Sequence, residues 1–389
     1  MLSEKQKEFW REANRRWNIK EGATRSGKTY LDYYWIARRI RNTRGDGLIV
    51  LLGNTRGTLE RNIIAPMRSI WGSRNIGRLA NDGSIELFGK RCYALGADKS
   101  SQKERLQGTG IEYCYGDEIT TWSKDVFEML KSRLDKPYSC FDGTCNPESP
   151  GHWFLKFLES GADIYRQSYT IYDNPFLEES FVKNLEREYA GSVYFDRYIL
   201  GRWTRAEGLV YPMFSKEKHT FLTPPQEGSY YISVDYGTAN PTSMGLWCVN
   251  GGAAYRIKEF YYDSRRSARQ LTDEEYYEKL CALSDKYPVE YVVVDPSAAS
   301  FITLIKRHGV FSVLKAKNSV LDGIRYTAGL INAGRIKISG ECRDILREFG
   351  AYCWDDTASG DAVIKENDHA MDEMRYFCMT VMRRFYERS

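Results

Sequence analysis

The segment Gly22–Thr29 is the feature that most constrains how this chain folds. Its sequence, GATRSGKT, fits the phosphate-loop pattern G-x-x-x-x-G-K-S/T at every fixed position. Glycines let such a loop curl until its N–H groups face phosphates, while Lys28 supplies positive charge and the Thr29 hydroxyl suits Mg²⁺. The flanks agree, because Trp17–Glu21 predicts a strand and Thr29–Arg41 predicts a helix whose N-terminus faces the anion. We therefore expect ATP and Mg²⁺ to bind at Gly22, Ala23, Thr24, Arg25, Ser26, Gly27, Lys28 and Thr29.

An N-terminal helix over Ser3–Arg15 precedes this loop. Ser3 and Gln6 have the spacing of a capping box, in which Ser3 caps the helix and Gln6 reaches back to it. A Gln just upstream of a phosphate loop can also read an adenine edge. The sequence leaves both roles open for Gln6.

A second nucleotide-site motif follows about 90 residues after the phosphate loop. The β-rich run Ile111–Gly116 ends in Asp117 and Glu118, which fits a Walker B strand. We expect Asp117 to hold the Mg²⁺ shell and Glu118 to polarise the attacking water. The next strand, within Tyr138–Pro147, ends in Thr144 and Asn146, where a neighbouring strand's nucleotide can be sensed.

Length and composition indicate a two-domain globular protein. The chain has 389 residues, of which 42% are hydrophobic and 28% charged. Its nine cysteines include no C-x-x-C pair, which argues against a zinc module and favours reduced thiols. A charged N-terminus and the lack of an 18-residue apolar run predict neither a signal peptide nor a membrane partner. We place a first domain at 1–205, a linker at 206–215 and a second domain at 216–389.

The second half predicts three strands and then alternating helices and strands, which is the ribonuclease H-like order. In that order Asp235, at the end of the first strand, lies beside Asp295, at the end of the fourth. The last helix opens at Asp368, predicted to be its N-cap, and places His369 and Asp372 on one face. Asp235, Asp295 and Asp372, with His369, would suit two Mg²⁺ or Mn²⁺ ions that clamp a phosphodiester. Lys315 and Lys317 are candidates for holding DNA phosphates, or ordinary surface lysines.

Taken together, these motifs resemble a large terminase subunit, the DNA-packaging motor of tailed double-stranded DNA phages. The likeness rests on Gly22–Thr29, on Asp117–Glu118, on the junction Arg202–Pro212, and on the nuclease segments at Val234–Gly237 and Asp368–Asp372. The nuclease segments, with Ala316–Val320, look like the branch named after a defective Bacillus prophage. The resemblance implies a P-loop ATPase domain of the ASCE, RecA-like type, followed by a ribonuclease H-like endonuclease domain. The expected activity is ATP-driven DNA translocation with endonucleolytic cutting.

The resemblance also implies partners and a location. The partners are viral double-stranded DNA, a small terminase subunit, a portal protein and further copies of this chain in a ring on the procapsid. The location is the host cytoplasm and, transiently, the portal vertex, without retention in the mature virion. A recombination helicase-nuclease is disfavoured, because the nuclease half fills the space of a second motor domain. A nucleotide-dependent DNA-binding protein with a degenerate nuclease is disfavoured by the full set of acids.

Two arginines are candidates for stabilising the charge of phosphoryl transfer. Arg25 lies inside the phosphate loop, so a role within its own subunit is implied by the resemblance. Arg105 lies in the basic run before Asp117, from which a ring neighbour could receive it as an arginine finger. The alternative is that Arg105 has no role in ATP hydrolysis and binds only DNA phosphates.

Overall fold

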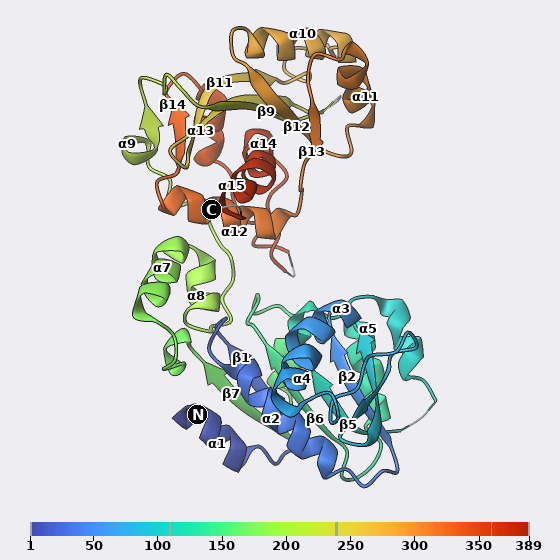
Figure 1. Cartoon of the computed structure of the whole chain (residues 1–389). Coiled ribbons are helices and arrows are strands. Elements are labelled where there is room, and N and C mark those ends of the chain that lie inside the picture. The colour runs from blue at the N-terminus through green and yellow to red at the C-terminus, as the bar shows by residue number, and fades with distance from the viewer. Residues whose placement is uncertain (1, 109, 238–239, 359, 388–389) are drawn as a thin grey trace. The chain divides into compact units, whose positions relative to one another are not determined.

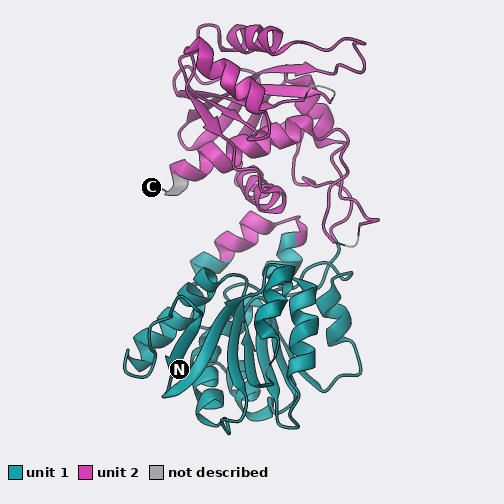
Figure 2. Cartoon of the chain, turned by 90° about the vertical axis from the view of Figure 1, so that its right-hand side faces the viewer, with its two compact units in different colours: residues 1–182, 194–205 teal, residues 183–193, 206–389 magenta. Residues whose placement is uncertain are grey.

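The computed structural model describes residues 2–108, 110–237, 240–358 and 360–387 (Figure 1). These residues form two compact units, coloured separately in Figure 2. Unit 1 runs to Val182 and includes Tyr194–Arg205, whereas unit 2 comprises Lys183–Val193 and the chain from Ala206 onward. Residues 206–215, treated as a linker in the sequence analysis, are thus grouped with unit 2.

Unit 1 is built on a seven-stranded sheet with the order β3-β4-β2-β5-β6-β1-β7. All neighbouring strands pair in parallel except β3 and β4, which form an antiparallel hairpin. Strand β6 lies between β1 and β5, so the strand before the phosphate loop and the Walker B strand both pair with β6. A strand inserted between the phosphate-loop strand and the Walker B strand is the arrangement of ASCE ATPases, as predicted. The strands are β1 (Trp17–Gly22), β2 (Leu48–Gly53), β3 (Ser84–Leu87), β4 (Lys90–Gly96), β5 (Ile111–Gly116), β6 (Cys140–Cys145) and β7 (Ile164–Tyr169).

Helices cover both faces of this sheet, because its central strands are apolar on both sides. In β2, Ile49 and Leu51 pack with helices α2 and α4 on one face, while Val50 and Leu52 pack with α5 and α6 on the other. A π-helical turn, Glu60–Ile64, joins α3 to α4. The helices of unit 1 are α1 (Glu4–Glu12), α2 (Lys28–Arg41), α3 (Arg56–Leu59), α4 (Ala65–Trp71), α5 (Lys124–Arg133) and α6 (Trp153–Leu158). Of the next two helices, α7 (Glu179–Tyr189) belongs mostly to unit 2 and α8 (Val193–Tyr198) mostly to unit 1.

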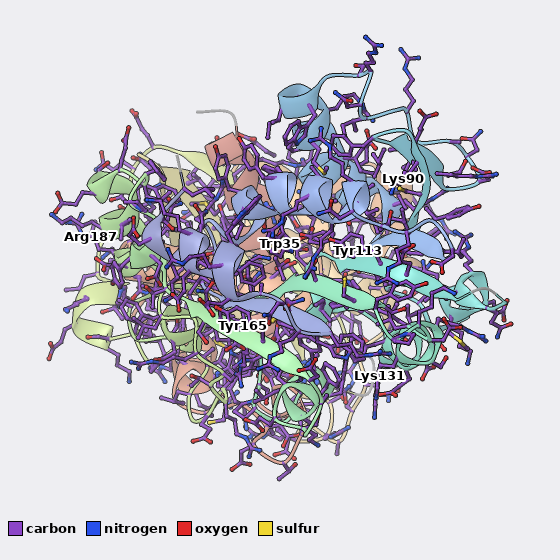
Figure 3. All side chains as sticks on the ribbon, turned by 90° about the horizontal axis from the view of Figure 1, so that it is seen from below. Trp35, Lys90, Tyr113, Lys131, Tyr165 and Arg187 are labelled. Atoms are coloured by element: carbon purple, nitrogen blue, oxygen red, sulfur yellow. The ribbon has the colours of Figure 1, made fainter. Side chains whose placement is uncertain are left out.

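Helix α1 is anchored to the sheet by aromatic packing. Phe9 is fully buried and meets Trp35 of α2 and Tyr165 of β7 edge-on, with ring centroids 5.4 and 5.6 Å apart. Both partners are labelled in Figure 3. The N-terminal helix is therefore fixed beside the helix that follows the phosphate loop.

Unit 2 contains a seven-stranded sheet with the order β13-β12-β9-β10-β11-β14-β8. Strands β9, β10 and β11 pair antiparallel, and β12 then pairs in parallel with β9. This confirms the ribonuclease H-like order and places the ends of β9 and β12 side by side. The strands are β8 (Thr220–Phe221), β9 (Ser229–Asp235), β10 (Thr242–Asn250), β11 (Ala253–Tyr262), β12 (Val289–Val294), β13 (Val313–Lys315) and β14 (Ile336–Ser339).

Helices cover both faces of this second sheet as well. Helices α10 and α11 pack on one face through Tyr276 and Phe301. On the other face Phe377 of α14 stacks on Trp247 of β10 at 4.4 Å, which holds the last nuclease helix against the sheet. The helices are α9 (Lys216–His219), α10 (Asp273–Ser284), α11 (Ala299–His308), α12 (Val320–Asn332), α13 (Arg343–Phe349), α14 (His369–Phe377) and α15 (Arg383–Glu387). No helix in the described part of the chain is long and apolar enough to cross a membrane.

Candidate functional sites

The phosphate loop leaves β1 at Gly22, a position that only glycine fits. Its φ is +132°, and a Cβ atom there would lie 2.0 Å from the carbonyl oxygen of Tyr169. The N–H of Ala23 donates to that same carbonyl at 2.8 Å, so the neighbouring strand β7 fixes the start of the loop. At the other end, Gly27 has a φ of +88° and lets the chain enter α2.

Lys28 lies beneath this loop and is 7% exposed. Its ammonium donates to the carbonyl of Gly22 at 2.8 Å and to Oδ1 of Asn146 at 3.2 Å. Burial lowers the pKa of Lys28 to about 8. A phosphate group placed against this amine would favour its charged form. Lys28 and Asn146 thus join the phosphate loop to the end of β6.

The Walker B acids are held by Thr144, the other polar residue near the end of β6. The Thr144 hydroxyl donates to Oδ1 of Asp117 at 3.1 Å, and the N–H of Glu118 donates to the Thr144 hydroxyl oxygen at 3.4 Å. Burial and the neighbouring charge of Glu118 raise the pKa of Asp117 to about 6. Glu118 has a left-handed backbone conformation, with φ +51°. Such conformations cost free energy and concentrate at functional sites.

A pocket of about 510 Å³ joins the two motifs. Its walls include Thr24–Thr29, Asp117, Glu118 and Asn146, all of which the sequence predicted. Gly22 and Ala23, also predicted, do not line the pocket. Thr144, named with Asn146 from the sequence, lines it as well. Other wall residues were not predicted from the sequence, namely Tyr30, Tyr33, Arg61, Asn62, Pro66, Cys145, Asn174 and Leu177. Of these, Asn62 donates to Asp117 Oδ2 at 3.5 Å from the π-helical turn, a local widening that no sequence periodicity indicates.

Of three further predicted residues, Gln6, Arg25 and Arg105, only Arg25 lines this pocket. Gln6 forms the capping box with Ser3, and its amide also donates to the carbonyl of Gly27 at 2.8 Å, so it supports the loop from behind. Arg25 lines the pocket and is exposed at a φ of +57°. Arg105 is exposed on the 3₁₀ turn Ser100–Leu106 and lies outside the pocket walls. A finger role for Arg105 therefore requires another subunit's site.

In unit 2, Asp235 of β9 and His369 of α14 form a close pair. Their Oδ2 and Nδ1 atoms are 2.9 Å apart. Burial and the charge of Asp372 raise the pKa of Asp235 above its ordinary value, although His369 opposes this. Burial lowers the pKa of His369, but the hydrogen bond and charge of Asp235 outweigh it, so this pKa lies above its ordinary value. The strand order predicted that Asp235 lies beside Asp295, whereas the pairing of Asp235 with His369 is a finding of the structure.

Asp295, directly after β12, is tied to the same helix. The Tyr376 hydroxyl donates to Asp295 Oδ2 at 2.6 Å, and the N–H of Ser297 donates to Oδ1 at 2.7 Å. Burial raises the pKa of Asp295, but these hydrogen bonds outweigh it, so the pKa lies below its ordinary value. Tyr376 is four residues after Asp372 and shares its helix face, a spacing that could have indicated it.

Asp372 is held by two cations of different character. The Arg375 guanidinium lies 2.9 Å from Asp372 Oδ1, and the Lys365 ammonium lies 3.6 Å from Oδ2. Lys365 also lies 3.4 Å from Oδ2 of Asp368. The sequence analysis assigned no role to Lys365.

Asp368 does not cap α14 with its side chain, which corrects the sequence prediction. Glu348 of α13 takes that role, since its Oε2 accepts the N–H groups of Ala370 at 2.7 Å and Met371 at 3.3 Å. Tyr261 donates to the other oxygen of Glu348 at 2.8 Å. Asp368 is thereby released to face the nuclease acids, although only 5% of it is exposed.

A pocket of about 470 Å³ is lined by Asp235, Asp368, His369 and Asp372. Asp295 lies outside its walls and is joined to the site through Tyr376. Lys315 and Lys317 are exposed but do not line it. The basic residues that do are Arg265, Arg266, Arg347 and Lys365.

The donor set of this pocket fits divalent metal ions, because carboxylate oxygens are the ligands that Mg²⁺ and Mn²⁺ prefer. Within the described residues, however, no three His, Cys, Asp or Glu side chains are grouped as a ready metal site. Each predicted acid is instead held by an internal donor: Asp235 by His369, Asp295 by Tyr376, and Asp372 by Arg375. Each donor uses only part of the acceptor capacity of its carboxylate, so a metal ion would share the acids with these donors.

Fold and sites together define a class: a P-loop motor ATPase joined to a ribonuclease H-like nuclease. Comparison with known proteins gives the family. Residues 19–218 match the sequence family described as terminase large subunit, T4likevirus-type, N-terminal. The chain belongs to the large terminase subunit family, and it is an ATPase and nuclease of DNA packaging.

The similarity extends over nearly the whole chain. The solved structure of a large terminase from a thermophilic bacteriophage is 34% identical, with a TM-score of 0.88 over 98% of this chain and 99% of that one. A second structure of that protein, in complex with ADP, has a TM-score of 0.85 at 34% identity, over 98% and 100% of the two chains. The large terminase subunit of Escherichia phage T5 is 23% identical over 328 residues, which are 78% of this chain and 73% of that protein. The predicted family is thus confirmed.

Proposed function

We propose that this chain uses ATP with Mg²⁺ to move viral double-stranded DNA into a procapsid, and cuts concatemeric DNA with Mg²⁺ or Mn²⁺. The observation that carries the motor assignment is the bridge made by β6. Asn146 contacts Lys28, and Thr144 contacts Asp117 and Glu118, so one strand end touches both nucleotide motifs. A related large terminase has been solved with ADP, which supports nucleotide binding in this pocket.

The side chains of the motor site have separable roles. Lys28 neutralises phosphate charge, and Thr29 and Asp117 would hold Mg²⁺, which stabilises the charge that develops on the transferred phosphoryl group. Glu118, half-buried at the pocket wall, orients and polarises water. Arg25 acts within its own subunit, whereas Arg105 reaches the site of a neighbouring subunit.

In the nuclease site, Asp235, Asp295 and Asp372 would hold the metal ions with His369. Metal ions at such a site stabilise the attacking and leaving oxygens of a phosphodiester. Tyr376 orients Asp295 through its hydroxyl, and His369 orients Asp235. Lys315 and Lys317 stay candidates for contacts to DNA phosphates away from the pocket.

The partners and location follow from this role. We propose that the chain works as a ring at the portal vertex of a procapsid in the host cytoplasm, with a small terminase subunit and a portal protein. It leaves before the virion is mature. Membership of the large terminase family supports these proposals.

The decisive test measures ATP turnover and DNA cleavage for each of two variants of the full-length chain. Glu118→Gln should keep ATP binding, lose ATP turnover by about 10³-fold and keep Mn²⁺-dependent plasmid cleavage. Asp235→Asn should keep ATP turnover and lose cleavage. Full ATPase activity in Glu118→Gln, or full cleavage in Asp235→Asn, would contradict the assigned roles.

The role of Arg105 has its own test, which uses mixed rings. The proposed shared site takes Glu118 from one subunit and Arg105 from its neighbour. Arg105→Ala subunits keep Glu118 but lack the finger, and Glu118→Gln subunits keep the finger but lack the water-polarising group. Mixing them should restore ATP turnover that neither variant has alone. No recovery with intact rings would return Arg105 to the role of binding DNA phosphates.

A further inference from the structure

Lys365 lies in the nuclease pocket with its ammonium between two carboxylates. Its Nζ is 3.4 Å from Asp368 Oδ2 and 3.6 Å from Asp372 Oδ2. Both acids are almost fully buried, at 5% and 9% exposure. Two adjacent buried carboxylates need a counter-charge, because unpaired charge is costly in a low-dielectric site. Lys365 supplies a charge that both acids share, from the loop before α14, while His369 Nε2 lies 3.8 Å from Asp368 Oδ1 and Arg375 pairs with Asp372.

The second cation at Asp372 differs from Lys365 in how firmly it is held. The guanidinium of Arg375 is 2% exposed, and it also donates to the carbonyls of Asn318 at 2.8 Å and Ser319 at 3.2 Å. The side chain of Lys365, by contrast, is 62% exposed. A lysine ammonium is a compact charge on a flexible stem, and an exposed ion pair contributes little free energy. Arg375 is therefore fixed, whereas Lys365 can leave at small cost.

We propose that Lys365 is an exchangeable resident cation of the nuclease site, which holds the Asp368–Asp372 pair until a divalent ion displaces it. This inference rests on the proposed metal dependence of cleavage. Lys365 then sets how much metal the site needs, because each divalent ion must compete with the ammonium for Asp372. It also keeps the carboxylates paired in the absence of metal, which fits the lack of a ready three-ligand cluster among the described residues.

The capping of α14 by Glu348 supports this role of Lys365, because it frees Asp368. Glu348 binds the helix N-terminus, so Asp368 is not committed to backbone N–H groups and can share the ammonium with Asp372. The charge of Lys365 is thus spread over two carboxylates from one turn of helix. Arg265 and Arg266 line the same pocket as Lys365, so DNA phosphates drawn to this basic wall would also attract a released ammonium.

The test measures metal binding rather than cleavage. Full-length chains carrying Asp117→Asn, which removes the metal-binding acid of the ATPase site, are titrated with Mn²⁺ by calorimetry without nucleotide or DNA. Lys365→Met should lower the dissociation constant for Mn²⁺ by about two- to fivefold, the range expected for losing a competing, partly exposed ion pair. Lys365→Arg should raise it, because a guanidinium holds carboxylates through paired hydrogen bonds.

Two further variants make the result interpretable. Lys306→Met, on α11 and outside the pocket walls, removes an exposed lysine of the same unit and should leave the Mn²⁺ constant unchanged. Asp235→Asn in the same background tests the metal centre itself and should weaken Mn²⁺ binding. If Lys365→Met binds Mn²⁺ no more tightly than the parent chain, the exchange is overturned. In that case a loss of binding in Asp235→Asn would still leave the metal-dependent nuclease standing.

Discussion

The nucleotide site and the nuclease site hold buried charge with different kinds of partner. In unit 1, Lys28 is surrounded by neutral acceptors such as the Gly22 carbonyl and Asn146, and Asp117 accepts from the hydroxyl of Thr144. In unit 2, Asp235 meets His369, and Asp372 lies between Arg375 and Lys365. Neutral donors keep their places when a charged ligand arrives, whereas cationic partners compete with a metal ion.

This difference separates a preformed site from one that must rearrange. The phosphate loop is already shaped by Gly22 and β7, so its chemistry depends on single side chains. The nuclease acids are held by a network, so their chemistry depends on how firmly α14 is anchored. Each of the following variants tests one side of that contrast.

The largest effect is expected for Lys28→Ala, since nothing else in its pocket replaces an ammonium beneath the phosphates. ATP affinity and turnover should both fall, with turnover lower by about 10²- to 10³-fold. Plasmid cleavage with Mn²⁺ should persist. Lys124→Ala, an exposed lysine at the start of α5, is the matched control and should keep ATPase activity. Loss of cleavage in Lys28→Ala would show that the two sites are not independent.

Glu348→Gln should weaken the anchoring of α14 in unit 2. It removes a buried carboxylate that accepts two helix N–H groups and the Tyr261 hydroxyl, a loss of about 2 kcal/mol. The unfolding transition of unit 2 in denaturant should move to lower concentration, and cleavage should fall while ATP turnover persists. Glu341→Gln, an exposed acid just before α13, should change neither. An unchanged transition in Glu348→Gln would remove the capping role assigned to Glu348.

Thr144→Val tests the bridge at β6. Losing the hydroxyl leaves Asp117 Oδ1 without its donor at 3.1 Å, which favours the protonated acid. Binding of Mg²⁺ with ATP should weaken by about tenfold, as for one lost charge-assisted hydrogen bond. Ser73→Ala, which changes an exposed hydroxyl residue of the same unit outside the pocket walls, serves as the control. Equal Mg²⁺ dependence in all three proteins would show that Asp117 does not rely on Thr144.

Acidification should affect the nucleotide site in a defined window. The pKa of Asp117 is raised from about 4 to about 6 by burial and by Glu118, so the folded site holds a proton that the unfolded chain releases. Above about pH 6 the carboxylate is ionised and available to Mg²⁺, and this availability is lost as the pH falls through 6. The stability contributed by this protonated acid is, conversely, lost as the pH rises from 4 to 6. Titration of Mg²⁺ with ATP at pH 5 and 7 checks the first effect, which pH-independent binding would contradict.

The smallest effect is expected for Lys315→Ala and Lys317→Ala, because neither residue lines the nuclease pocket. Each should lower the affinity for duplex DNA by less than about threefold and reduce the salt dependence of binding by about one counterion. Arg265→Ala and Arg266→Ala, at the pocket wall, should lower it more. The reverse ranking would place the DNA path along β13 rather than across the pocket.

How far the sequence predicted these sites depended on how local each interaction is. The phosphate loop, Asp117 and Glu118 are contiguous motifs, and the order of strands was enough to place the ends of β9 and β12, with Asp235 and Asp295, side by side. Asp368 does stand at the N-cap position of α14, as predicted, but its side chain does not cap the helix, because Glu348, twenty residues earlier, accepts the N–H groups of Ala370 and Met371. Lys365 was missed for a similar reason. Its role arises from a distance to Asp372 that no spacing rule encodes.

The π-helical turn Glu60–Ile64 has a consequence for how relatives of this chain diverge. Such a turn adds one residue to a helix, so the segments before and after it are rotated by about 100° relative to an unbroken helix. Asn62 reaches Asp117 from within this turn. Deleting one residue there would restore a regular helix and present a different side chain to the Walker B acid. A single-residue gap at this place in a relative would therefore mark a motor whose metal-binding acid has a different neighbour.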